Sequence, residues 1–131
     1  MYNFNFDFAR WPDTAQTFAG TCAAIVVNAK FTGVESLKIK ETDRTQALST
    51  ELAKFGVDFY EEEGYWILKG ETLANDTVKI NTYEDHRMAM CFAPLAIKHQ
   101  QIIIEDPMVV KKSYPSFWSD LESLGFSTSF T

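Results

Sequence analysis

The order of expected strands and helices constrains this chain most, because one arrangement of elements occurs twice. Strands are expected over residues 2–8, 31–39, 57–61, 65–69, 78–82, 101–106 and 126–130. Apolar residues at helical spacing predict helices over residues 14–28, 42–55, 86–95 and 115–124. The order is therefore βαβαββ followed by βαβαβ, which predicts an α/β (α+β) fold made of two similar units.

Two pairs of matching positions support this repeat. Asp13 and Asp85 each stand at the expected N-cap of the first helix of a unit, 72 residues apart. The segment "ELAKFGV" (51–57) also resembles "DLESLGF" (120–126). Short glycine-capped helices resemble one another by chance as well, but the shared order of elements favours a repeat. We expect units of about residues 1–72 and 73–131 within a single domain.

Length and composition exclude several classes of protein. A chain of 131 residues suits one hydrophobic core, and its net charge of −6 argues against a broad surface for nucleic acid or for an anionic membrane. The longest apolar runs are far shorter than the roughly 18 residues that span a bilayer, and a signal-peptide pattern is missing from the N-terminus. Cys22 and Cys91 fall within apolar helical patterns, where free thiols are expected. A cytoplasmic protein is predicted.

Basic residues at helix starts predict a binding site for an anion. Arg44 and Arg87 fall in the first turn of expected helices, where the helix dipole disfavours a cation unless an anion lies beside it. Lys112 precedes the last helix in a similar way. Alternatively, each arginine pairs with acids next to it in the sequence as an ordinary surface salt bridge. Convergence of the three cations would imply a multiply charged anionic ligand.

The carboxylates beside these cations have two interpretations. Asp13, Glu41 and Asp85 are candidates for proton transfer, but acids are also common at helix starts for structural reasons. The acids next to Arg87 are expected to orient it. His86 lacks partners at metal-ligand spacing, so a metal site is not predicted.

Four motifs resemble one family. "PDTAQT" (12–17), "LKIKETDR" (37–44), "YEDHRMAM" (83–90) and "DPMVVKKSYPSFW" (106–118) are similar, in order and spacing, to signatures of the 5-enolpyruvylshikimate-3-phosphate (EPSP) synthases, or 3-phosphoshikimate 1-carboxyvinyltransferases. The resemblance implies the inverse-barrel domain of that family, built from three βαβαββ units, of which this chain would carry about two. It covers the C-terminal part of a longer two-domain enzyme, and the strand at the second residue suggests a truncated chain.

The resemblance also implies an activity and a set of site residues. The family transfers the enolpyruvyl group of phosphoenolpyruvate to the 5-hydroxyl of shikimate 3-phosphate, releases phosphate and needs no cofactor. The implied catalytic residues are Asp13, as general base, and Glu41, for proton transfer at the methylene carbon. Substrate binding is implied for Asp13, Lys40, Arg44, Arg87 and Lys112. Ser36 and His86 are further candidates.

Other functions and partners stay open on the sequence. A nucleotide-sugar enolpyruvyltransferase is a related alternative, although "KETDR" with "DHRMAM" is not expected there. An isolated anion-binding module without activity, or a scaffold, are alternatives of other classes. The expected partners are the two substrates and the rest of the same enzyme. The chain alone is expected to be inactive and, with an apolar surface uncovered, to self-associate.

Overall fold

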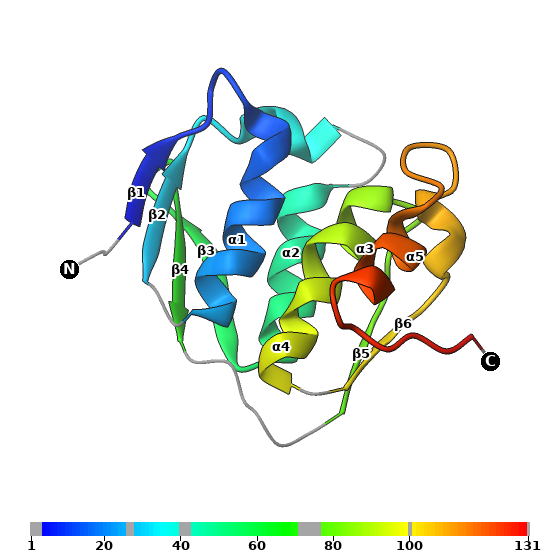
Figure 1. Cartoon of the computed structure of the whole chain (residues 1–131). Coiled ribbons are helices and arrows are strands. Elements are labelled where there is room, and N and C mark those ends of the chain that lie inside the picture. Colours follow the sequence, from blue (N-terminus) through cyan, green and yellow to red (C-terminus); the bar gives the residue numbers. More distant parts are fainter. Residues whose placement is uncertain (1–3, 26–27, 40–42, 71–76, 100, 131) are drawn as a thin grey trace.

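The chain folds around two sheets with helices packed between and beside them (Figure 1). The computed structural model describes residues 4–25, 28–39, 43–70, 77–99 and 101–130. A four-stranded sheet has the order β1-β2-β4-β3, and a second sheet pairs β5 with β6 in parallel. The strands are β1 (Phe4–Asp7), β2 (Ala29–Thr32), β3 (Val57–Glu62), β4 (Tyr65–Gly70), β5 (Val78–Ile80) and β6 (Ile102–Ile104).

The helices are short, and several of them are 3₁₀ helices of only a few residues. The α-helices are α1 (Ala15–Ala24), α2 (Arg44–Ala53), α3 (His86–Phe92), α4 (Ala96–His99) and α5 (Phe117–Ser123). The 3₁₀ helices are η1 (Pro12–Thr14), η2 (Glu35–Ile39), η3 (Ala93–Leu95) and η4 (Pro107–Val110). Within these described elements, no helix has the length and apolar character needed to cross a membrane.

One core joins the larger sheet to the helices. Phe31 of β2 and Leu52 of α2 are fully buried in the same cluster as Ile80 of β5 and Phe92 of α3. Figure 1 shows α1 and α2 beside the four-stranded sheet, with α3 alongside them on the side away from that sheet. Gly20 permits the close contact of α1 with α3, because a Cβ atom there would lie 2.6 Å from the carbonyl oxygen of Cys91. The α/β fold class predicted from the element order is confirmed.

The strands predicted over residues 57–61 and 65–69 are confirmed as β3 and β4, which form a hairpin. β3 and β4 pair antiparallel across Glu63 and Gly64, both of which have positive φ angles (51° and 83°). That conformation suits a tight turn between twisted strands. The helical pattern through Leu95 is divided, since Pro94 lies in η3 between α3 and α4.

The predicted strand over residues 31–39 is wrong beyond Thr32. Gly33 has a φ of 73° and turns the chain away from β2, and a Cβ atom on it would lie 2.2 Å from the backbone nitrogen of Ala9. The chain then forms η2 in place of a strand. Val34, just before this 3₁₀ helix, and Leu37 within it are both buried, so their burial does not require the predicted extended conformation.

The predicted last strand, residues 126–130, is also wrong. After α5, Gly125 has a φ of 106°, and the Phe126 amide bonds to the Leu121 carbonyl oxygen at 3.2 Å, which folds the chain back along the helix. The Phe130 ring lies 6.4 Å from that of Trp118. The alternating aromatic residues therefore pack on α5 and its neighbours and do not form strand pairs.

Candidate active site

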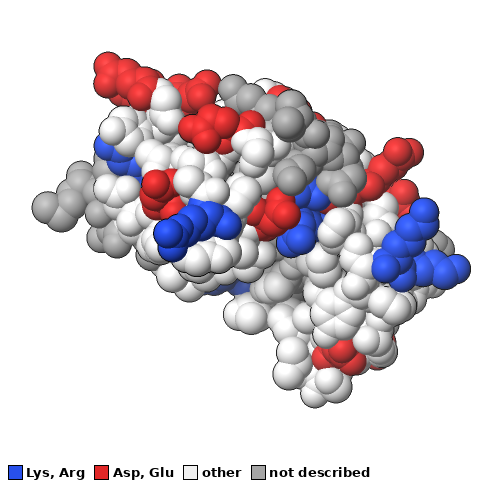
Figure 2. Space-filling model, turned by 90° about the horizontal axis from the view of Figure 1, so that it is seen from above, with Lys and Arg blue, Asp and Glu red and all other residues white. Residues whose placement is uncertain are grey.

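The segments that carry the predicted site residues lie at one end of the molecule. This end lies at the top of Figure 1, where β1 leads through η1 into α1, η2 precedes α2, and β5 leads into α3. Parallel strands followed by helices place all of these junctions at the carboxyl end of the strands, the usual position for a site in such folds. Figure 2, which views this end from above, shows acidic and basic side chains next to one another.

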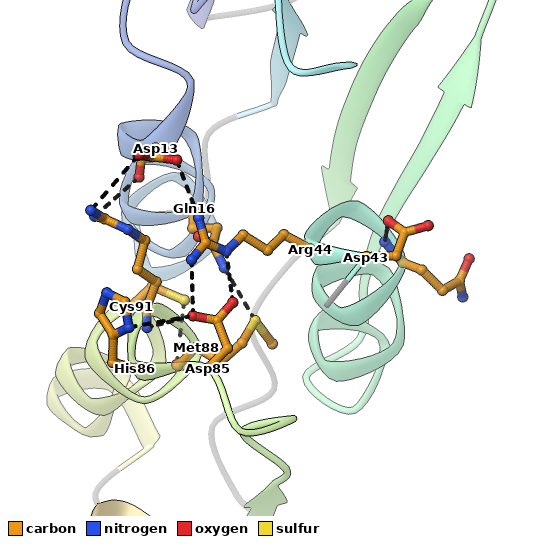
Figure 3. A network of polar contacts seen from close by, with 10 residues as sticks. Asp13, Gln16, Asp43, Arg44, Asp85, His86, Met88 and Cys91 are labelled. Atoms are coloured by element: carbon orange, nitrogen blue, oxygen red, sulfur yellow. Dashed lines mark hydrogen bonds and ion pairs between the residues drawn. The ribbon is translucent and has the colours of Figure 1, made fainter. Parts of the chain in front are cut away.

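Arg44 forms the centre of the site. It is the first residue of α2, and its Nε donates to Oδ2 of Asp85 at 2.7 Å while Nη2 donates to Oδ1 at 3.2 Å. The third nitrogen, Nη1, donates to Oδ1 of Asp13 at 3.2 Å. The Arg44 side chain is 2% exposed and that of Asp85 is 0% exposed. Figure 3 shows Arg44 reaching from α2 to a position between these two acids.

Asp85 has two roles at once. As predicted, it caps its helix, because Oδ1 accepts a hydrogen bond from the backbone nitrogen of Arg87 at 2.9 Å. The same carboxylate holds the guanidinium of Arg44 in a two-point pair. His86 Nδ1 lies 3.9 Å from Asp85 Oδ1. The expectation that Asp85 orients the Arg87 side chain is wrong, since its ionic partner is Arg44, 41 residues away.

Asp13 lies between both arginines. Its Oδ2 is 4.0 Å from Nη2 of Arg87, and its backbone carbonyl oxygen is 3.5 Å from Nη1 of the same residue. Asp13 does not cap α1 as predicted: it lies inside η1, and Thr14 holds the N-cap position without a side-chain bond. The Asp13 side chain is 41% exposed and that of Arg87 is 35% exposed. Two carboxylates and two guanidiniums thus form one cluster, which we call the Asp–Arg cluster.

Buried side chains, most of them apolar, lie next to the Asp–Arg cluster. Gln16 is buried and donates from Nε2 to the sulfur of Met88 at 3.4 Å, and Cys91 lies one helical turn beyond Met88 (Figure 3). Burial, followed by the Asp85 charge, raises the pKa of the Cys91 thiol. Burial raises the pKa of Cys22 to about 11. Both thiols are free and buried, as the sequence predicted. Burial around Cys91 also lowers the local dielectric, which strengthens the neighbouring pair of Arg44 with Asp85.

The alternative of local salt bridges is wrong for Asp43. Its Oδ1 accepts from the Gln46 backbone nitrogen at 3.1 Å and from Thr45 Oγ1 at 2.7 Å, so it caps α2. The ion pairs of Arg44 that the structure shows come from two other segments of the chain. Because they join helix starts that are far apart in sequence, they shape the site itself.

Of the remaining predicted site residues, the structure describes Ser36 and Lys112. Ser36 is half-buried in η2. Lys112 is exposed after η4, and among the residues that the structure describes no contact joins it to the cluster. Lys40 and Glu41 lie outside the described residues. In that same described part of the chain, no group of His, Cys, Asp and Glu side chains is arranged to hold a metal ion.

Sequence reasoning missed one buried acid near the site. Glu51 lies on α2 with its side chain 0% exposed, and it contacts the turn that leads to Asp85. A signal was present: Glu51 follows Arg44 by seven residues, two helical turns, and stands on the face that Leu48 and Leu52 bury. An acid on an apolar helix face is unusual enough to have been singled out.

The comparisons with known proteins agree with this arrangement. A sequence model of the family described as EPSP synthase (3-phosphoshikimate 1-carboxyvinyltransferase) matches residues 3–121. A 3-phosphoshikimate 1-carboxyvinyltransferase of Bacteroides fragilis is 51% identical over 122 residues, which are 92% of this chain and 30% of that relative. One from Vibrio campbellii is 36% identical over 124 residues, or 95% of this chain and 29% of the relative.

Solved structures with a similar fold are also EPSP synthases. The structure of an EPSP synthase from Acinetobacter baumannii superimposes with a TM-score of 0.77 at 24% sequence identity, covering 88% of this chain and 28% of that one. This likeness concerns the fold alone. The chain spans less than a third of the length of the relatives that it matches.

Proposed function

This chain belongs to the EPSP synthase family, and we propose that it carries part of the active site of a 3-phosphoshikimate 1-carboxyvinyltransferase. The reaction would join the 5-oxygen of shikimate 3-phosphate to C2 of phosphoenolpyruvate and would later release phosphate. The observation that carries this proposal is the Asp–Arg cluster, because it unites three residues proposed for the chemistry: Asp13, Arg44 and Arg87.

The roles of the cluster follow from charge and exposure. We assign to Arg87 the first contact with the phosphate or carboxylate of phosphoenolpyruvate, since its guanidinium is partly exposed. Arg44 supports the same anion from below and is fixed by Asp85. Two acids and two arginines are formally neutral, so an incoming anion competes with the Asp13 carboxylate. Its arrival would detach Asp13 from the guanidiniums and leave an ionised base beside the substrates.

The proton steps balance over addition and elimination. Asp13 takes the proton of the 5-hydroxyl as its oxygen bonds to C2, and Glu41 delivers a proton to the methylene carbon. In the second step the Glu41 carboxylate takes a proton back from the methyl group, the electrons of that C–H bond restore the double bond, and the bond from C2 to the phosphate oxygen breaks as phosphate leaves. Lys40 is assigned to shikimate 3-phosphate and Lys112 to phosphoenolpyruvate, with Ser36 as a further contact of shikimate 3-phosphate and His86 as a neighbour of the site. Arginines stabilise the charge of the departing phosphate.

The domain organisation is part of the same proposal. We propose that residues 1–72 and 73–131 are two related units within one domain of a two-domain enzyme. The element order β1-α1-β2-α2-β3-β4 supports the first unit, and β5-α3-β6-α5 supports most of the second. The small share of each relative that this chain spans supports a longer enzyme. A cytoplasmic location is proposed with the biosynthetic activity.

The proposed function is tested by replacing Arg87 in the full-length enzyme. Arg87→Gln is expected to lower kcat/KM for phosphoenolpyruvate by about 10²-fold or more, because one preorganised cation at the transferring group is lost. Phosphate release from the two substrates is the measurement. Arg10→Gln is the matched control, since Arg10 is exposed near the same end of the fold and outside the cluster. Near-normal turnover by Arg87→Gln would contradict the assignment.

The same assay separates an enzyme fragment from an anion-binding module. The chain alone is expected to release no phosphate, because the surfaces that would enclose most of shikimate 3-phosphate come from the rest of the enzyme. Steady release by the chain alone would show that it is a complete catalyst. Absence of turnover in the full-length protein, with phosphoenolpyruvate still bound, would favour the module.

We also propose that the rest of the enzyme covers an apolar surface near α4. Ile97 is 74% exposed and Leu124 is 76% exposed, and both line a groove together with Ala96 and Phe126. Exposed apolar surface of this kind drives association when its natural cover is missing. The chain alone is expected to dimerise or aggregate as its concentration rises, as measured by sedimentation velocity. Ile97→Lys should restore a monomer, and a monomer at all concentrations without that change would refute the idea.

A further inference from the structure

The turn that presents Asp85 and Arg87 has a strained backbone. Two consecutive residues that are not glycine, Tyr83 and Glu84, have φ angles of 55° and 57°. Side chains with a Cβ atom rarely adopt this left-handed conformation, and two in succession persist only when surrounding contacts fix them. Such strain is found most often where a side chain has to be aimed. The turn joins β5 directly to α3, so its shape determines where α3 begins.

Glu51 of α2 supplies contacts that hold this turn. Its Oε1 accepts hydrogen bonds from the backbone nitrogen of Asn81 at 3.0 Å and from Nζ of Lys54 at 2.6 Å. Its Oε2 accepts from the hydroxyl of Tyr83 at 2.5 Å. The carboxylate is 0% exposed and has three donors, so its charge is satisfied inside the fold. Lys54 also donates to the carbonyl oxygen of Lys79, which ties the same group to β5.

Helix α2 therefore holds the segment before α3 at two points. Arg44 binds Asp85 at the end of the turn, and Glu51 binds Tyr83 and Asn81 at its start. Residues seven apart on an α-helix lie on one face, two turns from each other. A shift of the turn relative to α2 would strain both contacts together. The positions of Asp85 and Arg87 are thereby coupled to a buried carboxylate outside the Asp–Arg cluster.

The Tyr83 hydroxyl stays protonated and so can always donate its hydrogen bond to Glu51. Burial, followed by the hydrogen bond and charge of Glu51, raises the pKa of Tyr83 to about 12. The hydroxyl consequently keeps its proton at neutral pH, and it can donate to the carboxylate throughout the range in which such an enzyme works.

We infer that Glu51 and Tyr83 are positioning residues that fix the strained turn and thereby set the affinity of the Arg44–Arg87 pair for its anionic ligand. They do not touch the proposed substrates, and they act through the place of Asp85 and Arg87. The identity of the anion as phosphoenolpyruvate rests on the proposed function. The positioning itself rests on the contacts of Glu51 and on the φ angles of the turn.

The test removes one hydroxyl group in the full-length enzyme. Tyr83→Phe keeps the ring and deletes the donor to Glu51, and Tyr60→Phe on β3 is the matched control. Tyr83→Phe is expected to raise KM for phosphoenolpyruvate about tenfold, the change that corresponds to one hydrogen bond to a charged group, with kcat changed by less than about twofold. Glu51→Gln, which keeps the side-chain size, is expected to act in the same direction if it folds.

A second readout does not depend on activity. The Arg44 Nε–H group, bonded to Asp85, is followed by nuclear magnetic resonance in arginine-labelled enzyme. Tyr83→Phe should shift its signal and speed its exchange with solvent, whereas Tyr60→Phe should leave both unchanged. If Tyr83→Phe lowers the melting temperature but leaves KM and the Arg44 signal unchanged, the inference is overturned. The hydrogen bond from Tyr83 to Glu51 would then stabilise the fold without positioning the arginines. If unmodified enzyme fails to use phosphoenolpyruvate, the proposed function falls, and the Arg44 signal still decides the positioning.

Discussion

Arg44→Met is expected to lower the free energy of unfolding by about 3–5 kcal/mol, the usual cost of removing one partner from a buried ion pair. Asp85 is 0% exposed and would be left buried without the two hydrogen bonds that the guanidinium donates to it. Methionine fills a similar volume, so the loss of charge dominates over a cavity. Urea denaturation of wild type and variant measures the difference.

A double-mutant cycle separates this pair from its surroundings. Arg44→Met with Asp85→Asn should be clearly less destabilised than the sum of the two single changes, because no buried charge then lacks its partner. Asparagine still caps a helix, so the start of α3 is kept. Asp13→Asn is the contrasting control: its carboxylate is 41% exposed, and the loss of that contact should cost below about 1 kcal/mol. Additive costs for Arg44 and Asp85 would contradict a coupled pair.

The largest effect on activity is expected from Asp13→Asn in the full-length enzyme. A general base contributes about 10²–10⁴-fold to rate, so kcat should fall by that factor. Binding of phosphoenolpyruvate should stay equal or become tighter, since a neutral amide no longer competes with the anion for the two guanidiniums. Steady-state turnover gives kcat, and calorimetric titration gives the dissociation constant.

The pattern of these two changes distinguishes a base from a structural acid. Asp43→Asn is the control, because Asp43 is an exposed helix cap whose role asparagine fills equally well. It should leave both quantities near those of wild type. A fall in affinity for phosphoenolpyruvate without a fall in kcat for Asp13→Asn would mean that Asp13 organises the arginines and transfers no proton.

Several elements of the fold were predictable from local patterns. The β3–β4 hairpin follows from a glycine in a short polar turn, and the Asp85 cap follows from an acid before a helical apolar pattern. These signals lie within a few residues of the structure that they specify. The strand predicted through residue 39 failed because Gly33 turns the chain, and because Phe31, Val34 and Leu37 recur every third residue, which suits a 3₁₀ helix better than a strand.

The last predicted strand failed for a related reason. Phe126 and Phe130 alternate with polar residues, but a strand also needs a partner edge, and partner choice leaves no local mark in the sequence. The hydrogen bond from Phe126 to Leu121 instead follows from the glycine at the end of α5, which had been predicted.

The gathering of acids and arginines from separate helix starts could be predicted in part, but the pairing between them could not. Arginines at helix starts indicated an anion site, and the structure brings Arg44 and Arg87 onto one carboxylate. Asp43, one neighbour considered as a partner of Arg44, caps α2 instead, and Asp85 from another segment pairs with Arg44. The packing of α1, α2 and α3 determines that Arg44 pairs with Asp85, and the spacing of residues along a single helix does not reveal this.

The sequence distances within the Asp–Arg cluster have a consequence for folding. Its contacts join residues 31, 41 and 74 positions apart, so each needs the closure of a long loop before it gains any free energy. A nascent chain that ends before α3 contains the Arg44 guanidinium without Asp85. Competence to bind the anion thus requires α1, α2 and α3 to be in place together. A ligand held by both arginines would then favour the finished fold over every partly folded form by mass action.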